Sequence, residues 1–426
     1  MNRKILYYIL LISFTVLSCK STQVTPTGNT DNKSAYNFSS LYNPGESLLD
    51  PECQIYIKDD NIATFYFKFD TENIRIISDD RESDIEMSVK YILRDMETQE
   101  VADSSTVSFN FDMKNNNYFV FDSLNIRMPE NKNYRLIANF LGIPQVKPKI
   151  ILLNIDNKNK YSPDKFSLQK ADSTNQFIFR NFVNKDNIYR IVSNEFNSMP
   201  VNIEFYSPSE FSIIPPYNAN FIDNRIFIPD SIFRYQIGDT LSFKKKGFYI
   251  LKPDSSSDKY LCILNYGHDF PNITTVGDMV EPIKLIATSK EYNKIKESED
   301  VKQAIDEYWL SRSSNQRFAK EQIRVFYNRV QLANLYFSDN IEGWKTDRGN
   351  IYVVFGAPSV INISDNREEW FYGENPDVAG LLFVFNKTDN PFSNNTYIME
   401  RDVLYQPTWG QALSTWRKGR VFSISK

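Results

Sequence analysis

The spacing of apolar residues changes once along the chain, at about Ser289, and this change limits the folds that the chain can adopt. Before it, short alternating or continuous apolar runs, such as 63–69 and 134–138, are separated by polar turns. Such runs are typical of β-strands. After it, apolar residues recur at steps of three and four, which is typical of helices. We therefore predict an α+β fold that is mostly β, with strands first and helices later.

The strand-like part divides into two expected domains. Six or seven strands between residues 37 and 155 predict an immunoglobulin-like β-sandwich. A second β-rich domain is expected over 156–285, and we interpret it as another sandwich. Its expected strands cover residues 176–179, 201–205, 225–228, 241–243 and 260–264.

Residues 286–426 are expected to form a helical segment followed by a small α+β domain. Helices are predicted over 290–312, with a break near Ser298, and over 315–337, where Ser313 and Ser314 offer a cap. The second helix carries a continuous apolar stripe that needs a partner surface. The stripe comprises Ile323, Phe326, Tyr327, Val330, Ala333, Asn334 and Phe337.

The N-terminus has the features of a secretion signal. Two basic residues precede an apolar run over 5–17, which is too short to span the ~30 Å hydrocarbon layer of a membrane. Because Ser18 and Cys19 follow, residues 1–18 resemble a bacterial lipoprotein signal peptide, and Cys19 is the predicted site of lipid attachment. Residues 19–36 are polar and predict a flexible tether.

The segment Gly343-Trp344-Lys345-Thr346-Asp347-Arg348-Gly349 is the densest group of special residues in the chain. The β-branched and aromatic residues at 351–355 predict a buried strand after it, ended by Gly356 and Pro358. We expect this strand to cover the apolar stripe of the helix at 315–337.

Gly343, Trp344, Thr346 and Asp347 resemble the motif of the GWxTD domain, which is found mainly in lipoproteins of Bacteroidota. The flanking residues of that family also match, at Arg348, Gly349, Gly356 and Pro358. The resemblance covers the last quarter to third of the chain. It implies a cell-envelope protein, and it implies no reaction.

The motif has two interpretations. Asp347 and Arg348 could form a polar recognition site with Trp344 as an aromatic platform. Alternatively, Thr346 or Asp347 accepts backbone amides in a turn, Arg348 pairs with a helix carboxylate, and Trp344 fills the junction. The sequence favours the structural role, because the motif supplies neither a base nor a nucleophile.

Few enzymatic or ligand-binding motifs are present elsewhere. His268 is the single histidine, which excludes a multi-histidine metal site and makes a catalytic triad unexpected. The sequence contains no nucleotide-binding loop and no Gly-x-Ser-x-Gly elbow. The net charge is −4 and the basic residues are scattered among acidic ones, so the sequence predicts no basic surface for nucleic acid. We expect no enzyme, no metal and no cofactor, and we interpret the acidic stretch 79–84 as a solvated loop rather than a calcium site.

Cys53 and Cys262 are expected to be two separately buried thiols, with a disulfide in an oxidising compartment as the alternative. Four Asp-Ser or Asp-Thr pairs followed by an apolar residue or a threonine resemble the O-glycosylation acceptor sequence of Bacteroidota. The acceptor residues would be Ser123, Ser173, Ser231 and Thr240.

Together these features predict a non-catalytic lipoprotein of the cell envelope. We expect it to be anchored to the outer membrane. The resemblance to lipoproteins of Bacteroidota implies that it faces the periplasm, because the acidic cluster that their surface-exported members often carry after the cysteine is absent after Cys19. Its expected role is to bind other envelope proteins within a secretion, transport or envelope-biogenesis assembly. The alternatives are glycan binding by exposed aromatic residues and, as a weaker one, hydrolysis by a carboxylate pair.

Overall fold

The computed structural model describes most of the chain after the N-terminal segment. The described residues are 37–45, 49–59, 61–70, 85–111, 119–129, 131–142, 147–208, 213–220, 226–253, 259–375 and 379–424. Cys19 and the acidic stretch 79–84 lie outside them. Contacts group the chain from Tyr36 to Lys426 into one unit.

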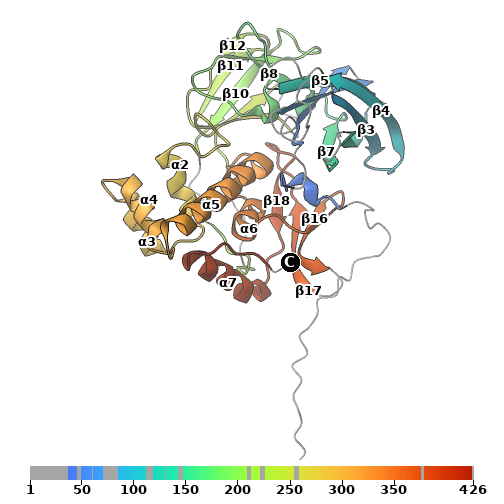
Figure 1. The fold of residues 1–426 in the computed structure, drawn as a ribbon. Coiled ribbons are helices and arrows are strands. Elements are labelled where there is room, and N and C mark those ends of the chain that lie inside the picture. Colours follow the sequence, from blue (N-terminus) through green and yellow to red (C-terminus); the bar gives the residue numbers. More distant parts are fainter. Residues whose placement is uncertain are drawn as a thin grey trace, which may run out of the picture. The chain divides into compact units, whose positions relative to one another are not determined.

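The first β module is a two-sheet sandwich (Figure 1). One sheet has the order β1-β2-β5 and the other β4-β3-β6-β7, and apolar residues from both sheets share one core. Tyr134 at the start of β6 donates its hydroxyl to the carbonyl of Pro129, which is the tyrosine corner of immunoglobulin-like sandwiches. The strands are β1 (Glu52–Asp59), β2 (Ile62–Asp70), β3 (Ile85–Asp95), β4 (Val101–Phe111), β5 (Phe119–Arg127), β6 (Asn133–Leu141) and β7 (Lys149–Asp156).

The second β module also has two sheets, in the orders β12-β9-β8 and β11-β10-β13-β14, around one core. Two expected strands are not observed. Residues 176–179 form only an isolated bridge at Phe177 and lead into a short 3-10 helix, η4 (Phe179–Asn181), and residues 226–228 are not in a strand. The strands are β8 (Ser167–Lys170), β9 (Tyr189–Val192), β10 (Pro200–Tyr206), β11 (Ser231–Gln236), β12 (Thr240–Leu241), β13 (Gly247–Lys252) and β14 (Leu261–Asn265).

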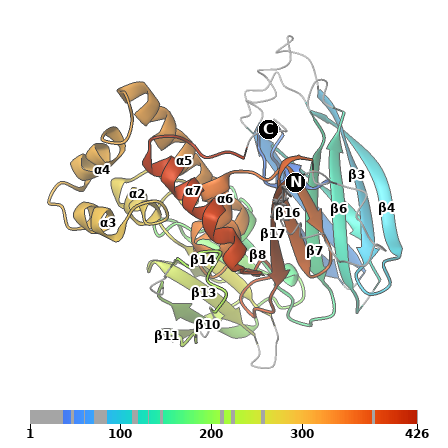
Figure 2. The same ribbon diagram turned by 90° about the horizontal axis from the view of Figure 1, so that it is seen from below.

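Helices and a four-stranded sheet in the order β15-β16-β17-β18 share the core of the C-terminal part. Figure 2 shows α6 and α7 beside β16 and β17. The helices are α2 (Val276–Ile283), α3 (Ser289–Lys296), α4 (Val301–Leu310), α5 (Gln316–Phe337), α6 (Asp347–Phe355) and α7 (Gln406–Arg417). The strands are β15 (Val360–Ile363), β16 (Arg367–Asn375), β17 (Ala379–Lys387) and β18 (Tyr397–Met399).

The fold class is confirmed, since the described residues form an α+β structure that is mostly β. The predicted helices are also found, as α3 and α4 with a break between them and as α5. The cap of α5 differs from the expected one, because Asn315 accepts the amide of Phe318. None of the helices in the described part combines the length and the apolar composition needed to cross a membrane.

The strand expected at 351–355 is wrong, because these residues belong to helix α6. Thr346 caps its N-terminus and Gly356 ends it with φ +88°, a backbone angle that suits glycine. Each residue from Arg348 to Phe355 is buried, so the helix has no polar face to produce a helical period. The expected contact is nevertheless present, since α6 packs against α5.

Candidate functional site

Two glycines of the motif bring three backbone segments into direct contact. Gly343 begins the 3-10 helix η5 (Gly343–Lys345), and a Cβ atom there would lie 2.0 Å from the carbonyl oxygen of Ala333 in α5. A Cβ atom on Gly349 in α6 would lie 1.8 Å from the carbonyl oxygen of Gly343. Neither position has room for a side chain, so the packing of α5, η5 and α6 requires both glycines.

Thr346 and Asp347 fix the start of α6. The Thr346 hydroxyl accepts the amide of Gly349 at 3.0 Å and donates to the carbonyl of Gly343 at 2.8 Å. The Asp347 carboxylate accepts the amide of Met399 in β18 at 2.8 Å and pairs with Arg401 at 2.5 Å. Thr346 is therefore a helix cap, and Asp347 joins the helix to the sheet.

Trp344 is buried in the core shared by the helices and the sheet. Its backbone amide donates to Oδ1 of Asn334 at 3.3 Å, which holds η5 against α5. Buried in this way, the indole ring offers no platform for a ligand.

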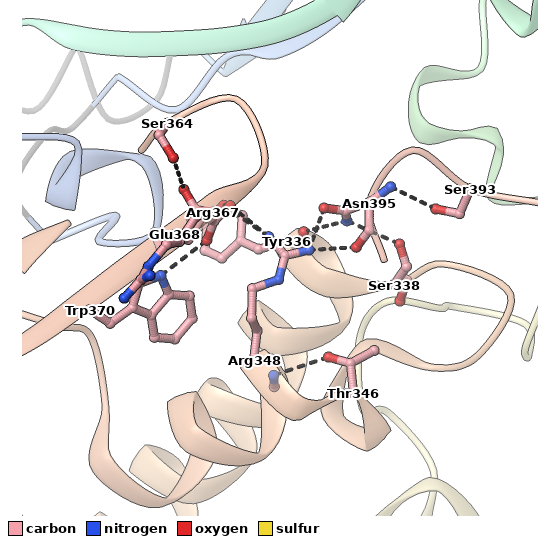
Figure 3. A network of polar contacts seen from close by, with 12 residues as sticks. Tyr336, Ser338, Thr346, Arg348, Ser364, Arg367, Glu368, Trp370, Ser393 and Asn395 are labelled. Atoms are coloured by element: carbon pink, nitrogen blue, oxygen red, sulfur yellow. Dashed lines mark hydrogen bonds and ion pairs between the residues drawn. The ribbon is translucent and has the colours of Figure 1, made fainter. Parts of the chain in front are cut away.

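Arg348 is the centre of a buried polar network (Figure 3). Its Nη1 donates to Oε1 of Glu368 in β16 at 2.9 Å, and its Nη2 donates to the carbonyl of Asn395 at 2.6 Å and to Oδ1 of the same residue at 2.5 Å. Glu368 also accepts Nε1 of Trp370 at 3.0 Å. The Asn395 amide group donates to the carbonyl of Tyr336 at 3.0 Å, at the end of α5. The network thus connects α5, α6 and the sheet.

The Arg348 guanidinium stays protonated despite its burial. Burial alone would lower the pKa of Arg348, but the attraction of the Glu368 carboxylate helps to outweigh it, and the pKa of Arg348 lies above its ordinary value. The expected partner was a carboxylate on a helix. That expectation is wrong, because Glu368 lies on a strand.

Tyr42 reaches this network from the N-terminal segment of the chain. Its hydroxyl donates to Oε1 of Glu368 at 3.1 Å and accepts Nη1 of Arg348 at 3.3 Å. The hydroxyl of Tyr352 donates to the carbonyl of Tyr42 at 2.7 Å. Burial, and then the Glu368 carboxylate, raise the pKa of Tyr42 well above its ordinary value. Sequence reasoning missed Tyr42, Glu368 and Asn395, since no local pattern joins them to the motif.

The last two motif residues, Gly356 and the buried Pro358, follow the end of α6. Arg329 of α5 donates Nη1 to the carbonyls of Val353 and Val354, both at 3.2 Å, so it caps the last turn of α6. Burial lowers the pKa of Arg329 to about 10. These contacts again give the motif a structural role.

A small cavity of about 60 Å³ lies beside the motif. Each carboxylate in its lining already has a partner. Asp269 contacts His268 at 2.7 Å, and Asp278 takes part in the capping box of α2. Glu281 accepts a hydrogen bond from Tyr292, and Glu342 pairs with Lys345 at 2.6 Å. Hydrogen bonds from Thr274 and His268 lower the pKa of Asp269. The space accommodates only a few water molecules.

In the part of the chain that the structure describes, no group of three or more His, Cys, Asp or Glu side chains could hold a metal ion.

The other predicted residues are dispersed. Cys53 and Cys262 are free and partly buried, and burial raises the pKa of both thiols. The predicted acceptor residues of O-glycosylation lie on separate segments and their modification stays a prediction. Ser173 and Thr240 are exposed, whereas Ser123 and Ser231 are partly buried.

The pattern of the GWxTD domain family matches residues 247–418, from β13 to just past α7. No curated protein matches the chain. The solved structures that it resembles include a glycosyl hydrolase family 2 member from Bacteroides cellulosilyticus DSM 14838, at 10% identity and a TM-score of 0.18, over 28% of this chain and 16% of that one. They also include Salmonella alpha-2-macroglobulin reacted with methylamine, at 9% identity and a TM-score of 0.18, over 55% of this chain and 17% of that one. The chain therefore spans less than a fifth of either protein, and likenesses this weak carry no functional argument.

Proposed function

Residues 247–418 form a GWxTD domain, and from this premise we propose that the chain is a non-catalytic, protein-binding component of a cell-envelope assembly. The observation that carries the proposal is that the polar side chains of the motif are already bound within the protein. Thr346, Asp347 and Arg348 direct their polar groups to partners inside the protein. A motif engaged in this way stabilises a scaffold, so binding is expected on other surfaces.

The edge of β11 is the surface that best fits a protein partner. β11 is the outer strand of its sheet, and within the described residues its second edge pairs with no strand. Ile232 and Phe233 of β11 are 56% and 40% exposed, and Ile226 and Ile228, in the segment that leads into β11, are 85% and 76% exposed. Unpaired backbone groups beside apolar side chains are complementary to an added strand of another protein.

The test is crosslinking and affinity purification of the full-length protein from native membranes. We expect a defined set of partners that is lost when Ile228 and Ile232 are both changed to lysine. Val403 and Leu404 are similarly exposed, at 62% and 66%, so their double lysine variant is the matched control and should retain the partners. Recovery of the same proteins with both variants, or of the chain alone from wild-type membranes, would reject this surface.

In this proposal Cys19 carries the lipid and anchors the protein to the outer membrane, facing the periplasm. The expected tether ends just before Asn37, whose side-chain amide donates to the carbonyl of Ser359 at 3.3 Å. Incorporation of a labelled fatty acid should be abolished by Cys19→Ala. Label retained by that variant would contradict the lipid site.

Glycan binding is the second candidate, because β5 exposes two aromatic rings on the outer face of the first sandwich. Phe119 is 52% exposed and Phe121 51%, and the ring of Phe121 lies 5.8 Å from that of Tyr66 with an interplanar angle of 18°. Aromatic faces of this kind can stack on sugar rings. Binding on a glycan array that disappears in Phe119→Ala/Phe121→Ala would favour this function over protein binding.

A further inference from the structure

We propose that the GWxTD domain contains a binding recess for a short, tyrosine-bearing peptide segment with one 3-10 turn, and that residues 37–42 of this chain fill that recess in cis, with η2 (Ser39–Leu41) as the turn. We call it the Tyr42 recess. It is lined by Tyr336 and Phe337 of α5, Arg348 and Tyr352 of α6, and Glu368 and Trp370 of β16.

The recess is complementary to a phenol side chain. The ring centroid of Tyr42 lies 4.8 Å from that of Phe337 and 5.5 Å from that of Trp370, so its apolar body is held between aromatic walls. Its hydroxyl lies between Glu368, which accepts at 3.1 Å, and Arg348, which donates at 3.3 Å. A phenylalanine could fill the same space, but it would leave both charged groups without these hydrogen bonds.

The backbone of the segment is also bound. The Phe38 amide donates to the carbonyl of Ile361 at 3.0 Å, and the Asn37 side chain accepts the Ile361 amide at 3.1 Å. Ile361 belongs to β15, the outer strand of its sheet, and the side chain of Phe38 enters the core. A backbone contact with a sheet edge together with a side-chain pocket is a known mode of peptide recognition, and here the chain turns through η2 between the two.

The recess and its occupant are separable. Without Tyr42, Arg348 still pairs with Glu368 and Asn395, and Glu368 still accepts from Trp370, so the polar end of the recess remains assembled. Tyr42 is 306 positions from Arg348 and lies outside the residues that match the family. We therefore assign the recess to the domain and its occupant to the N-terminal segment. The partner that it fits is a segment with an apolar residue four positions before a tyrosine and a 3-10 turn between them, as in Phe38 and Tyr42.

Release of the segment would affect more than the recess. The carbonyl of Ser40 accepts Nζ of Lys149 in β7 at 2.8 Å, so the segment also contacts the first β module. A competing peptide would therefore remove one contact between that module and the GWxTD domain. Because β11 takes no part in the recess, either site can fail its test without the other.

The test uses the full-length variant Phe38→Ala/Tyr42→Ala and a fluorescent peptide of residues 36–45. We expect saturable binding by fluorescence anisotropy, at least tenfold tighter to the variant than to the wild-type protein, whose recess is filled. The same peptide with Tyr42→Ala should bind at least tenfold more weakly. Equal binding to both proteins, or no binding to a variant that circular dichroism shows to be folded, would overturn the proposal.

A second measurement covers the case in which the variant does not fold. In the wild-type protein, the Phe38 amide should exchange with solvent at least tenfold faster than the Asn350 amide of α6, and excess unlabelled peptide 36–45 should speed its exchange further. If both amides exchange together and the peptide has no effect, the segment opens only when the domain unfolds, and the recess is not a binding site.

Discussion

Nη1 of Arg348 lies 2.9 Å from Oε1 of Glu368, and the side chains are only 1% and 4% exposed. The pair joins α6, which begins at the motif residue Asp347, to the sheet of β15 to β18. Asn395 accepts a hydrogen bond from the guanidinium, and Trp370 donates one to the carboxylate. These bonds reduce the free-energy cost of burying the two groups. The arginine that follows the GWxTD residues thus holds the elements of the domain together, whether or not the Tyr42 recess is occupied.

Removing one member of this pair should be strongly destabilising, because the other charge would stay buried without its counter-ion. We expect Arg348→Met to lower the free energy of unfolding by about 3–5 kcal/mol, measured by urea denaturation of the full chain. Arg324 pairs with Glu321 on the surface at 2.6 Å, so Arg324→Met is the control and should cost less than ~1 kcal/mol. Equal costs for the two variants would contradict the structural role of Arg348.

The motif glycines should not tolerate even a methyl group. Gly343→Ala and Gly349→Ala force a Cβ atom to within 2.0 Å and 1.8 Å of a carbonyl oxygen, so we expect each to destabilise the protein by about 1–3 kcal/mol or more. Gly410 within α7 has no atom within 4 Å of such a Cβ, and Gly410→Ala should be neutral or stabilising by up to about 1 kcal/mol. Thermal midpoints of the three variants are the measurement. A tolerated alanine at position 349 would show that α6 can move away from η5.

The cap of α6 can be tested by changing one hydroxyl. Thr346→Ala leaves the Gly349 amide without its partner and should cost about 1 kcal/mol in urea denaturation. Thr346→Ser keeps the oxygen and should retain most of the stability. If serine is as damaging as alanine, the threonine methyl group rather than the cap is what matters.

Stability should depend on pH through Asp164, whose Oδ2 accepts the amide of Asp156 at 3.0 Å where the first β module ends. Burial raises the pKa of Asp164 from 3.8 to about 7 in the folded protein. Between these values the folded state holds a proton that the unfolded state has lost, so the Asp164 contribution to stability falls as the pH rises from 3.8 to about 7. Asp164→Asn should therefore make the thermal midpoint fall less steeply over this range. Parallel pH profiles for the two proteins would place the carboxyl in a more solvated site.

The sequence by itself determined the order of the secondary-structure elements, with strands first and helices after about Ser289. The reason is that the spacing of apolar residues follows the period of each kind of element. It located α5 closely, and it favoured a structural role for Thr346 and Arg348. The residues of α6 were mistaken for a strand, because β-branched residues favour strands locally while burial on every side removed the helical period. Only the tertiary structure decided that Tyr42, Glu368 and Asn395 meet at Arg348. These residues come from four separate segments, and contacts between distant segments depend on how the elements pack, which no local pattern of residues records.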